Sequence, residues 1–192
     1  MASAFYVDFS FPEREYRRVT LLGTRDFGIT FQKSSGLELV AFADADYASK
    51  ATDRRSVSGG AVLCAGACVC EFSRTEKCVT LSTTEAEYVA LGDTIKDAIF
   101  IGYVWSFIFW GFGATYMTIV EENEGARHLA QNPVCTSNSK LIDVRHHFLR
   151  ELIFRGEFII TNVESEDQHA GFLTKSLSNV AFCYHRDFLI NI

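Results

Sequence analysis

The order of extended and helical segments is the feature of this 192-residue sequence that most restricts its fold. Short stretches rich in Val, Cys, Ile and Phe predict strands, and longer segments of mixed apolar and polar residues predict helices. The predicted strands lie within 23–44 (two runs joined by KSSG), 61–67, 68–74, 115–120 and 158–163, and the predicted helices cover 81–107, 121–132, 143–157 and the region from 166 onward. This order predicts an α/β protein in which a mixed sheet carries helices on its faces.

The composition favours a folded, acidic protein. Hydrophobic residues make up 48% of the chain, with 17 Phe and only 2 Pro, which is enough for a sizeable core. The formal net charge is −6. A protein that holds nucleic acid by charge alone is expected to be basic. Any nucleic-acid binding must therefore be local, through a basic patch or through bridging cations.

The cysteines and the first residues bear on the compartment. The six cysteines show no CxxC pair and no zinc-finger spacing with His. The opening MASAFYVDFSFPERE has neither the basic start nor the apolar middle of a secretory signal. We expect free thiols in a reducing compartment, and a cytoplasmic or nuclear protein that is not secreted.

Residues 98–120 form a run of 23 residues without a charge. That length is sufficient to span a bilayer. The run also contains three glycines and several polar residues, and a break at the sequence WGFGA would divide it into a helix end and a strand. The second alternative is favoured over a membrane span.

Acidic residues fall where three separate elements begin or end. Asp44 ends the apolar stretch LVAFAD, Glu121 and Glu122 follow another strand, and Glu85 and Glu87 lie in the first turns of the long helix. Asp is common in turns, so a strand simply leaving the core remains one interpretation of Asp44. A metal or acid–base site at the end of a sheet is the other.

The spacing of the helix glutamates separates their roles. Two residues correspond to about 200° around a helix, so Glu85 and Glu87 point to nearly opposite sides. Glu87 shares its stripe with Leu91, Ile95 and Ala98, which are apolar. An inward-facing carboxylate requires a partner, either a basic side chain or a cation. Carboxylates from several elements suit Mg2+ (or Mn2+), and two such ions about 4 Å apart can support phosphodiester cleavage.

The motifs ADADY, LSTTEAEY, IDVRHHFLRE and AGFLTK, in this order, resemble the ribonuclease H domain at the end of copia-type retrotransposon Pol polyproteins. The resemblance runs from about Gly23 to the C-terminus. It implies a ribonuclease H-like domain over 23–192, with a five-stranded mixed sheet. Residues 1–22 would then be an N-terminal segment left from the reverse transcriptase connection.

The family reaction is metal-dependent hydrolysis of RNA in RNA–DNA hybrids, carried by four carboxylates. The resemblance places the first three at Asp44, Glu87 and Glu122, as catalytic residues and metal ligands. The third is an Asp in the family, and Glu lengthens the arm by one methylene. The fourth, also an Asp, falls on Gly171, and Asp167 lies four residues earlier. These departures imply that the reaction is weakened or lost.

Two further expectations concern partners. The basic groups expected to contact a nucleic-acid backbone are Arg54, Arg55, Lys140, Arg145, His146 and Arg150. The aromatic segment 98–120 departs from the charged family pattern and is a candidate surface for a protein partner. One alternative to a weakened nuclease is therefore a catalytically inactive, domesticated binding protein that uses the same fold to engage nucleic acid or a protein. Another is a non-functional remnant whose fold persists.

Overall fold

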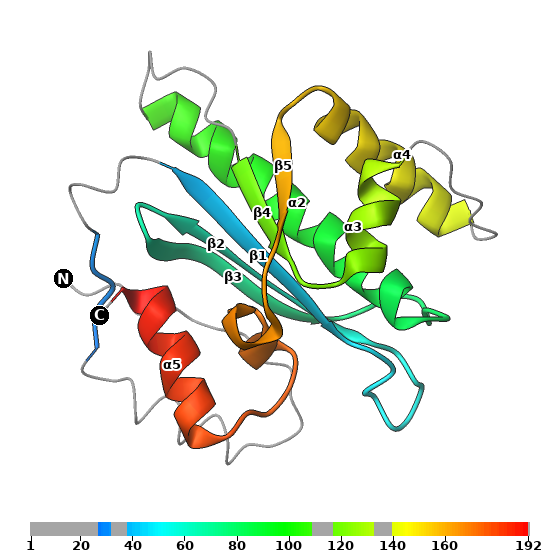
Figure 1. The fold of residues 1–192 in the computed structure, drawn as a ribbon, viewed down its shortest axis with the longest axis horizontal. Helices are drawn as coiled ribbons and strands as arrows, with labels where there is room; N and C mark the ends of the chain where they lie inside the picture. Colours follow the sequence, from blue (N-terminus) through cyan, green and yellow to red (C-terminus); the bar gives the residue numbers. More distant parts are fainter. Residues whose placement is uncertain (1–26, 32–37, 109–116, 133–139, 192) are drawn as a thin grey trace.

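The computed structural model describes residues 27–31, 38–108, 117–132 and 140–191, with the side chains of 140–146 excepted. Its elements are shown in Figure 1. In chain order they are β1 (Leu39–Asp46), β2 (Val57–Cys64), β3 (Ala67–Thr75), α2 (Thr83–Ile108), β4 (Met117–Glu121), α3 (Glu124–Gln131), α4 (Lys140–Phe154), β5 (Phe158–Asn162), the 3₁₀ helices η2 (Ser165–Asp167) and η3 (Gly171–Leu173), and α5 (Asn179–Ile190).

The strands form one mixed sheet in the order β3-β2-β1-β4-β5. β1 pairs antiparallel with β2, and β2 pairs antiparallel with β3. β1 pairs parallel with β4, and β4 pairs parallel with β5. The prediction of a five-stranded mixed sheet with helices on its faces is confirmed. The first of the two extended runs expected in 23–44 forms no strand over residues 27–31, and its remainder lies outside the described residues.

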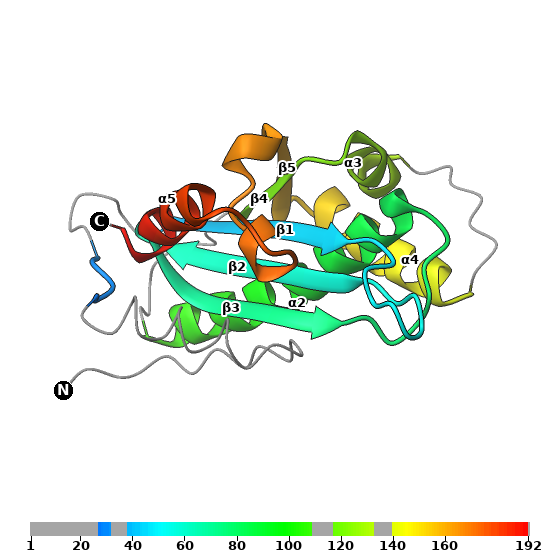
Figure 2. The ribbon, with the colours of Figure 1, turned by 90° about the horizontal axis from the view of Figure 1, so that it is seen from below.

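Helices cover both faces of the sheet. The larger core cluster joins α2, α3 and α4 to side chains such as Ala41, Val62 and Ile119. The smaller cluster joins η3 and α5 to Phe42, Leu63 and Val120 on the opposite face. Figures 1 and 2 show α5 and α2 on opposite sides of the sheet. Because successive strand residues point to opposite faces, Ala41 and Phe42 serve different layers.

The start of α2 has the local structure that its sequence predicts. The backbone N–H of Glu85 donates to Ser82 Oγ at 3.2 Å, and the Glu85 carboxylate accepts from the N–H of Leu81 at 2.7 Å. These bonds satisfy N–H groups that a helix start leaves without partners. The predicted inward stripe is also present, because Glu87 is 3% exposed and Leu91, Ile95 and Ala98 are fully buried.

The second half of α2 is apolar and partly exposed. It ends at Ile108, before the WGFGA sequence, which lies outside the described residues. Phe100, Tyr103 and Phe107 are 64%, 71% and 83% exposed. Among the helices that the structure describes, none is long and apolar enough to cross a membrane.

Two glycines in β2 allow both helical layers to approach the sheet. A Cβ on Gly60 would lie 2.4 Å from the side chains of Phe72 and Thr94, and Thr94 belongs to α2. A Cβ on Gly59 would lie 2.7 Å from Thr174 Cγ2 and 3.0 Å from Leu173 Cβ, on the other face. Glycine is used where backbones must approach closely. Gly59 therefore permits the segment after η3 to reach the centre of the sheet.

The C-terminal region differs in part from its prediction. Residues 166–177, expected to begin a helix, contain the short elements η2 and η3 instead, and α5 begins only after Ser178. The Ser178 hydroxyl accepts from the Ala181 N–H, which caps α5. Helix α4 ends at Phe154, and Gly156 follows with a φ of 70°, as predicted for a helix that closes near this glycine. The proposed boundary between residues 22 and 23 lies outside the described residues and stays a prediction.

The cysteines of the described ranges, Cys64, Cys68, Cys70, Cys78 and Cys183, are free thiols. Burial raises the pKa of Cys64, Cys68 and Cys70 above the ordinary value of a thiol. Thiols with raised pKa values carry little thiolate at neutral pH and are poor nucleophiles and metal ligands. The remaining cysteine, Cys135, lies outside the described residues.

Candidate metal centre

Three carboxylates from three separate elements meet at one edge of the sheet. Asp44 lies near the end of β1, Glu87 in the second turn of α2, and Glu122 directly after β4. One oxygen from each lies within 4.8 Å of the others. Asp44 is completely buried, Glu87 is 3% exposed and Glu122 is partly exposed. The structure therefore brings together the three residues that the sequence singled out.

The parallel pairing of β1 and β4 explains why two of them meet. The register runs from Leu39 opposite Met117 to Phe42 opposite Val120. Continuing the same register by two residues puts Asp44 beside Glu122. Because parallel strands end at the same edge of a sheet, both carboxylates leave it at one place. Glu87 joins them because α2 packs across β1 with its inward stripe.

Glu121 is a further buried acid that the sequence analysis noted at a strand end and did not assign to the site. It is fully buried, and its Oε1 accepts from the Asn123 N–H at 2.9 Å. Burial raises the pKa of Glu121 well above its usual range, and Asp44 and Glu122 add to this effect. The sequence signal for a separate role of Glu121 was the alternation of strand residues, which sends the side chains of Glu121 and Glu122 to opposite faces of the sheet.

The electrostatics of this cluster favour a bound cation. Burial raises the pKa of Glu87 to about 10, and repulsion from Glu121, Asp44 and Glu122 contributes. Glu87 Oε2 and Glu121 Oε2 are buried and lack a hydrogen-bond partner among the described residues. Buried carboxylate oxygens without partners are costly. A divalent cation that prefers oxygen ligands would satisfy them, so the residues present fit Mg2+ or a similar ion.

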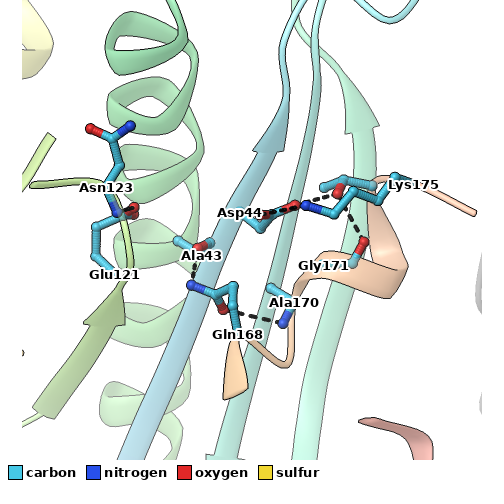
Figure 3. A network of polar contacts seen from close by, with 9 residues as sticks. Ala43, Asp44, Glu121, Asn123, Gln168, Ala170, Gly171 and Lys175 are labelled. Atoms are coloured by element: carbon cyan, nitrogen blue, oxygen red, sulfur yellow. Dashed lines mark hydrogen bonds and ion pairs between the residues drawn. The ribbon is translucent and has the colours of Figure 1, made fainter. Parts of the chain in front are cut away.

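Segment 168–175 contacts Asp44 from the face of the sheet opposite α2 (Figure 3). The Thr174 hydroxyl donates a hydrogen bond to Asp44 Oδ2. The Lys175 ammonium lies 3.5 Å from Asp44 Oδ1. The Gln168 side chain donates to the Ala43 carbonyl at 2.8 Å, which fixes this segment to β1. Thr174 and Lys175 were not predicted as site residues, although both belong to the LTK part of a recognised motif.

Position 171, where the family pattern has its fourth acid, is close to this contact. Gly171 is buried, and a Cβ built on it would lie 3.5 Å from Lys175 Cε and 3.8 Å from Lys175 Nζ. These are ordinary contact distances, so a Cβ fits there. Asp167 does not replace the missing acid, because its Oδ1 accepts from the Tyr184 hydroxyl at 2.7 Å and the residue is exposed.

The predicted basic residues have different surroundings. Arg54 is exposed. Arg55 forms an ion pair with Asp53 at 2.6 Å and donates to the Glu76 carbonyl. Arg150 is partly buried and donates to the Leu129 carbonyl. Two of the six are thus already engaged within the chain. The other three, Lys140, Arg145 and His146, belong to α4, and their side chains lie outside the described part of the structure.

No protein-family model matches the chain. Solved structures match its fold. The N-terminal RNase H domain of Rv2228c from Mycobacterium tuberculosis, solved as a fusion with maltose-binding protein, gives a TM-score of 0.53 at 16% identity, covering 79% of this chain and 98% of that one. LC11-RNase H1 in complex with an RNA/DNA hybrid gives 0.52 at 12% identity, covering 71% and 94%. The chain is therefore an α/β protein with the ribonuclease H-like fold.

Sequence relatives show which group of proteins with this fold the chain is related to. The Retrovirus-related Pol polyprotein from transposon RE2 of Arabidopsis thaliana is 34% identical over 163 residues, which cover 84% of this chain. The chain spans 11% of the length of that polyprotein. The homologues are Pol polyproteins of copia-type transposons, and this chain is a retrotransposon Pol relative with a ribonuclease H-like fold.

Proposed function

We propose that this chain binds RNA–DNA hybrids and hydrolyses their RNA strand in a metal-dependent reaction that is slow compared with a four-carboxylate centre. The observation that carries the proposal is the approach of Asp44, Glu87 and Glu122 to within 4.8 Å. The fold and the Pol relatives support the same class of reaction, and the hybrid bound to LC11-RNase H1 supports the class of substrate.

In the proposed reaction the chain contributes ligands and position. Asp44, Glu87 and Glu122 would hold Mg2+ (or Mn2+), which supplies an activated water and stabilises the leaving oxygen of the phosphodiester. Asp44 is the most rigid ligand, because it is buried in β1 and held by Thr174. Glu122 is partly exposed beyond the end of β4, so it is the ligand closest to solvent and to an approaching backbone.

Two substitutions account for the expected slow rate. Gly171 supplies no carboxylate where the family pattern has one, so one ligand of a two-ion centre is missing. Glu122 has a longer arm than the Asp of the pattern, and metal ligands must be placed to within about 0.5 Å. The first change removes a ligand, whereas the second displaces one, so restoring position 171 should have the larger effect.

A cleavage assay with a labelled RNA–DNA hybrid, in Mg2+ and separately in Mn2+, tests this proposal. We expect slow cleavage by the wild type, none by Asp44→Asn, and an increase of about tenfold or more for Gly171→Asp. Gly171→Asn is the matched control, because it adds the same volume without the charge, and it should remain at the wild-type rate. Absence of cleavage in the wild type and in Gly171→Asp, with normal folding, would contradict the proposal.

A second candidate function is a binding protein without catalysis. It is favoured by the exposed aromatic residues of α2, where Phe100, Tyr103 and Phe107 lie on the part of segment 98–120 that the structure describes. Such a protein would retain hybrid binding in every cleavage-deficient variant, or bind a protein partner through this surface. Replacing the three aromatic residues by Ser should then abolish capture of that partner without changing hybrid binding.

A further inference from the structure

The strongest unassigned feature of the centre is the pair of contacts that Thr174 and Lys175 make with Asp44. Each contact engages a different oxygen of the carboxylate, Oδ2 for Thr174 and Oδ1 for Lys175. The two residues adjoin η3, the element that contains Gly171. Both oxygens of a proposed metal ligand are therefore occupied by the segment that lacks the fourth acid.

The Thr174 half of this contact is rigid. Thr174 and the neighbouring Leu173 are fully buried. The Thr174 backbone N–H donates to the Gly171 carbonyl at 3.2 Å, and Gln168 ties the same segment to the Ala43 carbonyl. Gly59 leaves the space that this segment occupies. Thr174 is thus fixed against β1 whether or not a cation is present.

The Lys175 half can be displaced. Its side chain is 45% exposed, whereas the Asp44 side chain is completely buried. A lysine with a long flexible stem can turn its ammonium into water at little cost, unlike a packed threonine. Lys175 also interacts electrostatically with Glu122 and Glu87, so its charge acts on all three proposed ligands. These are the carboxylates that a divalent cation would contact.

We propose that Thr174 and Lys175 form a clamp on Asp44, in which the Lys175 ammonium serves as an internal counter-ion and a divalent cation binds by displacing it from Asp44 Oδ1. The assignment deepens the proposed function and rests on the same centre. It makes Lys175 a positioning residue that holds the carboxylates together without metal and competes with the metal for them.

Calorimetric titration of the full chain with Mn2+ tests the clamp. We expect Lys175→Met to bind Mn2+ about tenfold more tightly than the wild type, because a positive charge 3.5 Å from Asp44 Oδ1 no longer opposes the cation. Lys175→Arg keeps the charge and should bind with nearly wild-type affinity. Equal or weaker binding by a folded Lys175→Met variant overturns the clamp and leaves the proposed metal centre standing.

A second measurement tests the counter-ion role of Lys175 if Mn2+ binds to neither protein, an outcome that would contradict the proposed function and the displacement step of the clamp. The clamp then predicts that Lys175→Met unfolds at lower urea concentration than the wild type in EDTA, because Asp44 loses its counter-ion, and that Lys175→Arg does not. Unchanged unfolding midpoints for Lys175→Met in that case would overturn the clamp as well. The two proposals can therefore fail separately.

Discussion

Two neighbouring histidines, His169 after η2 and His185 in α5, allow a quantitative prediction of how the free energy of unfolding depends on pH. His169 is 3% exposed and His185 is 6% exposed, and their Nδ1 atoms lie 3.0 Å apart. The His169 ring stacks on Phe188 with centroids 3.6 Å apart. Burial, with a contribution from the neighbouring His185, lowers the pKa of His169 from 6.5 to about 4, while Asp167 acts in the opposite direction. The folded protein therefore requires His169 to be neutral.

The sign and size of the effect follow from proton linkage. Below pH 6.5 the unfolded chain takes up a proton at His169 that the folded chain does not, so stability falls as the pH falls from 6.5 towards 4. Since one pKa unit corresponds to 1.36 kcal/mol, the loss amounts to about 2 kcal/mol at pH 5. It remains above about 1.5 kcal/mol if the pKa in the folded state is a full unit higher.

Urea unfolding of the wild type and of His169→Leu, at about pH 7.5 and about pH 5, measures this loss. The variant removes the titrating ring and keeps an apolar side chain against Phe188, so it should lose about 2 kcal/mol less than the wild type between the two pH values. Comparing the two proteins cancels the carboxylates that titrate in both. His128→Gln, at an exposed position of α3, is the control and should behave as the wild type. Identical pH dependence in the wild type and His169→Leu would refute the reasoning.

Three other predictions concern stability. Burial raises the pKa of Glu71 from 4.5 to about 7, so the folded state keeps a proton there that the unfolded chain releases. The free energy of unfolding therefore falls as the pH rises from 4.5 to 7. Glu71→Gln should reduce that fall by about 1 to 3 kcal/mol in urea unfolding. Gly59→Ala should cost about 1 to 3 kcal/mol, because the new Cβ meets Thr174 at 2.7 Å, whereas Gly28→Ala, with no atom within 4 Å, should not show this packing cost. Ile119→Ala, in the centre of the sheet, should lower the free energy of unfolding by about 2 to 5 kcal/mol, and a loss under about 1 kcal/mol would contradict its core position.

Local features of this protein were predictable because their causes are local. The capping box of α2 depends on residues three or four apart, and the inward stripe of Glu87, Leu91 and Ile95 depends on the period of the helix. The end of α4 at Phe154 likewise depends on one following residue, Gly156, that readily adopts a positive φ. Where the local signal was weak, as over 166–177, the expected helix was replaced by two 3₁₀ helices.

The surroundings of the candidate centre were not predictable in the same way. The Thr174 hydroxyl and Asp44 lie 130 residues apart in the sequence, and their contact depends on the position of η3 against β2 and on the space left by Gly59. The engagement of Arg55 with Asp53 and the Glu76 carbonyl also depends on how loops pack. Such contacts are decided by packing between elements, which a residue pattern does not encode directly.

The sequence by itself determined the class of fold, the family relationship and the three acids that end or begin separate elements, because strand alternation, helix period and motif order are properties of neighbouring residues. The tertiary structure alone decided that Asp44, Glu87 and Glu122 come within 4.8 Å, that Glu121 is buried beside them, and that Lys175 reaches Asp44. The physical reason is that strand order and register, which set these distances, are fixed by long-range pairing and by the packing of helices on both faces of the sheet.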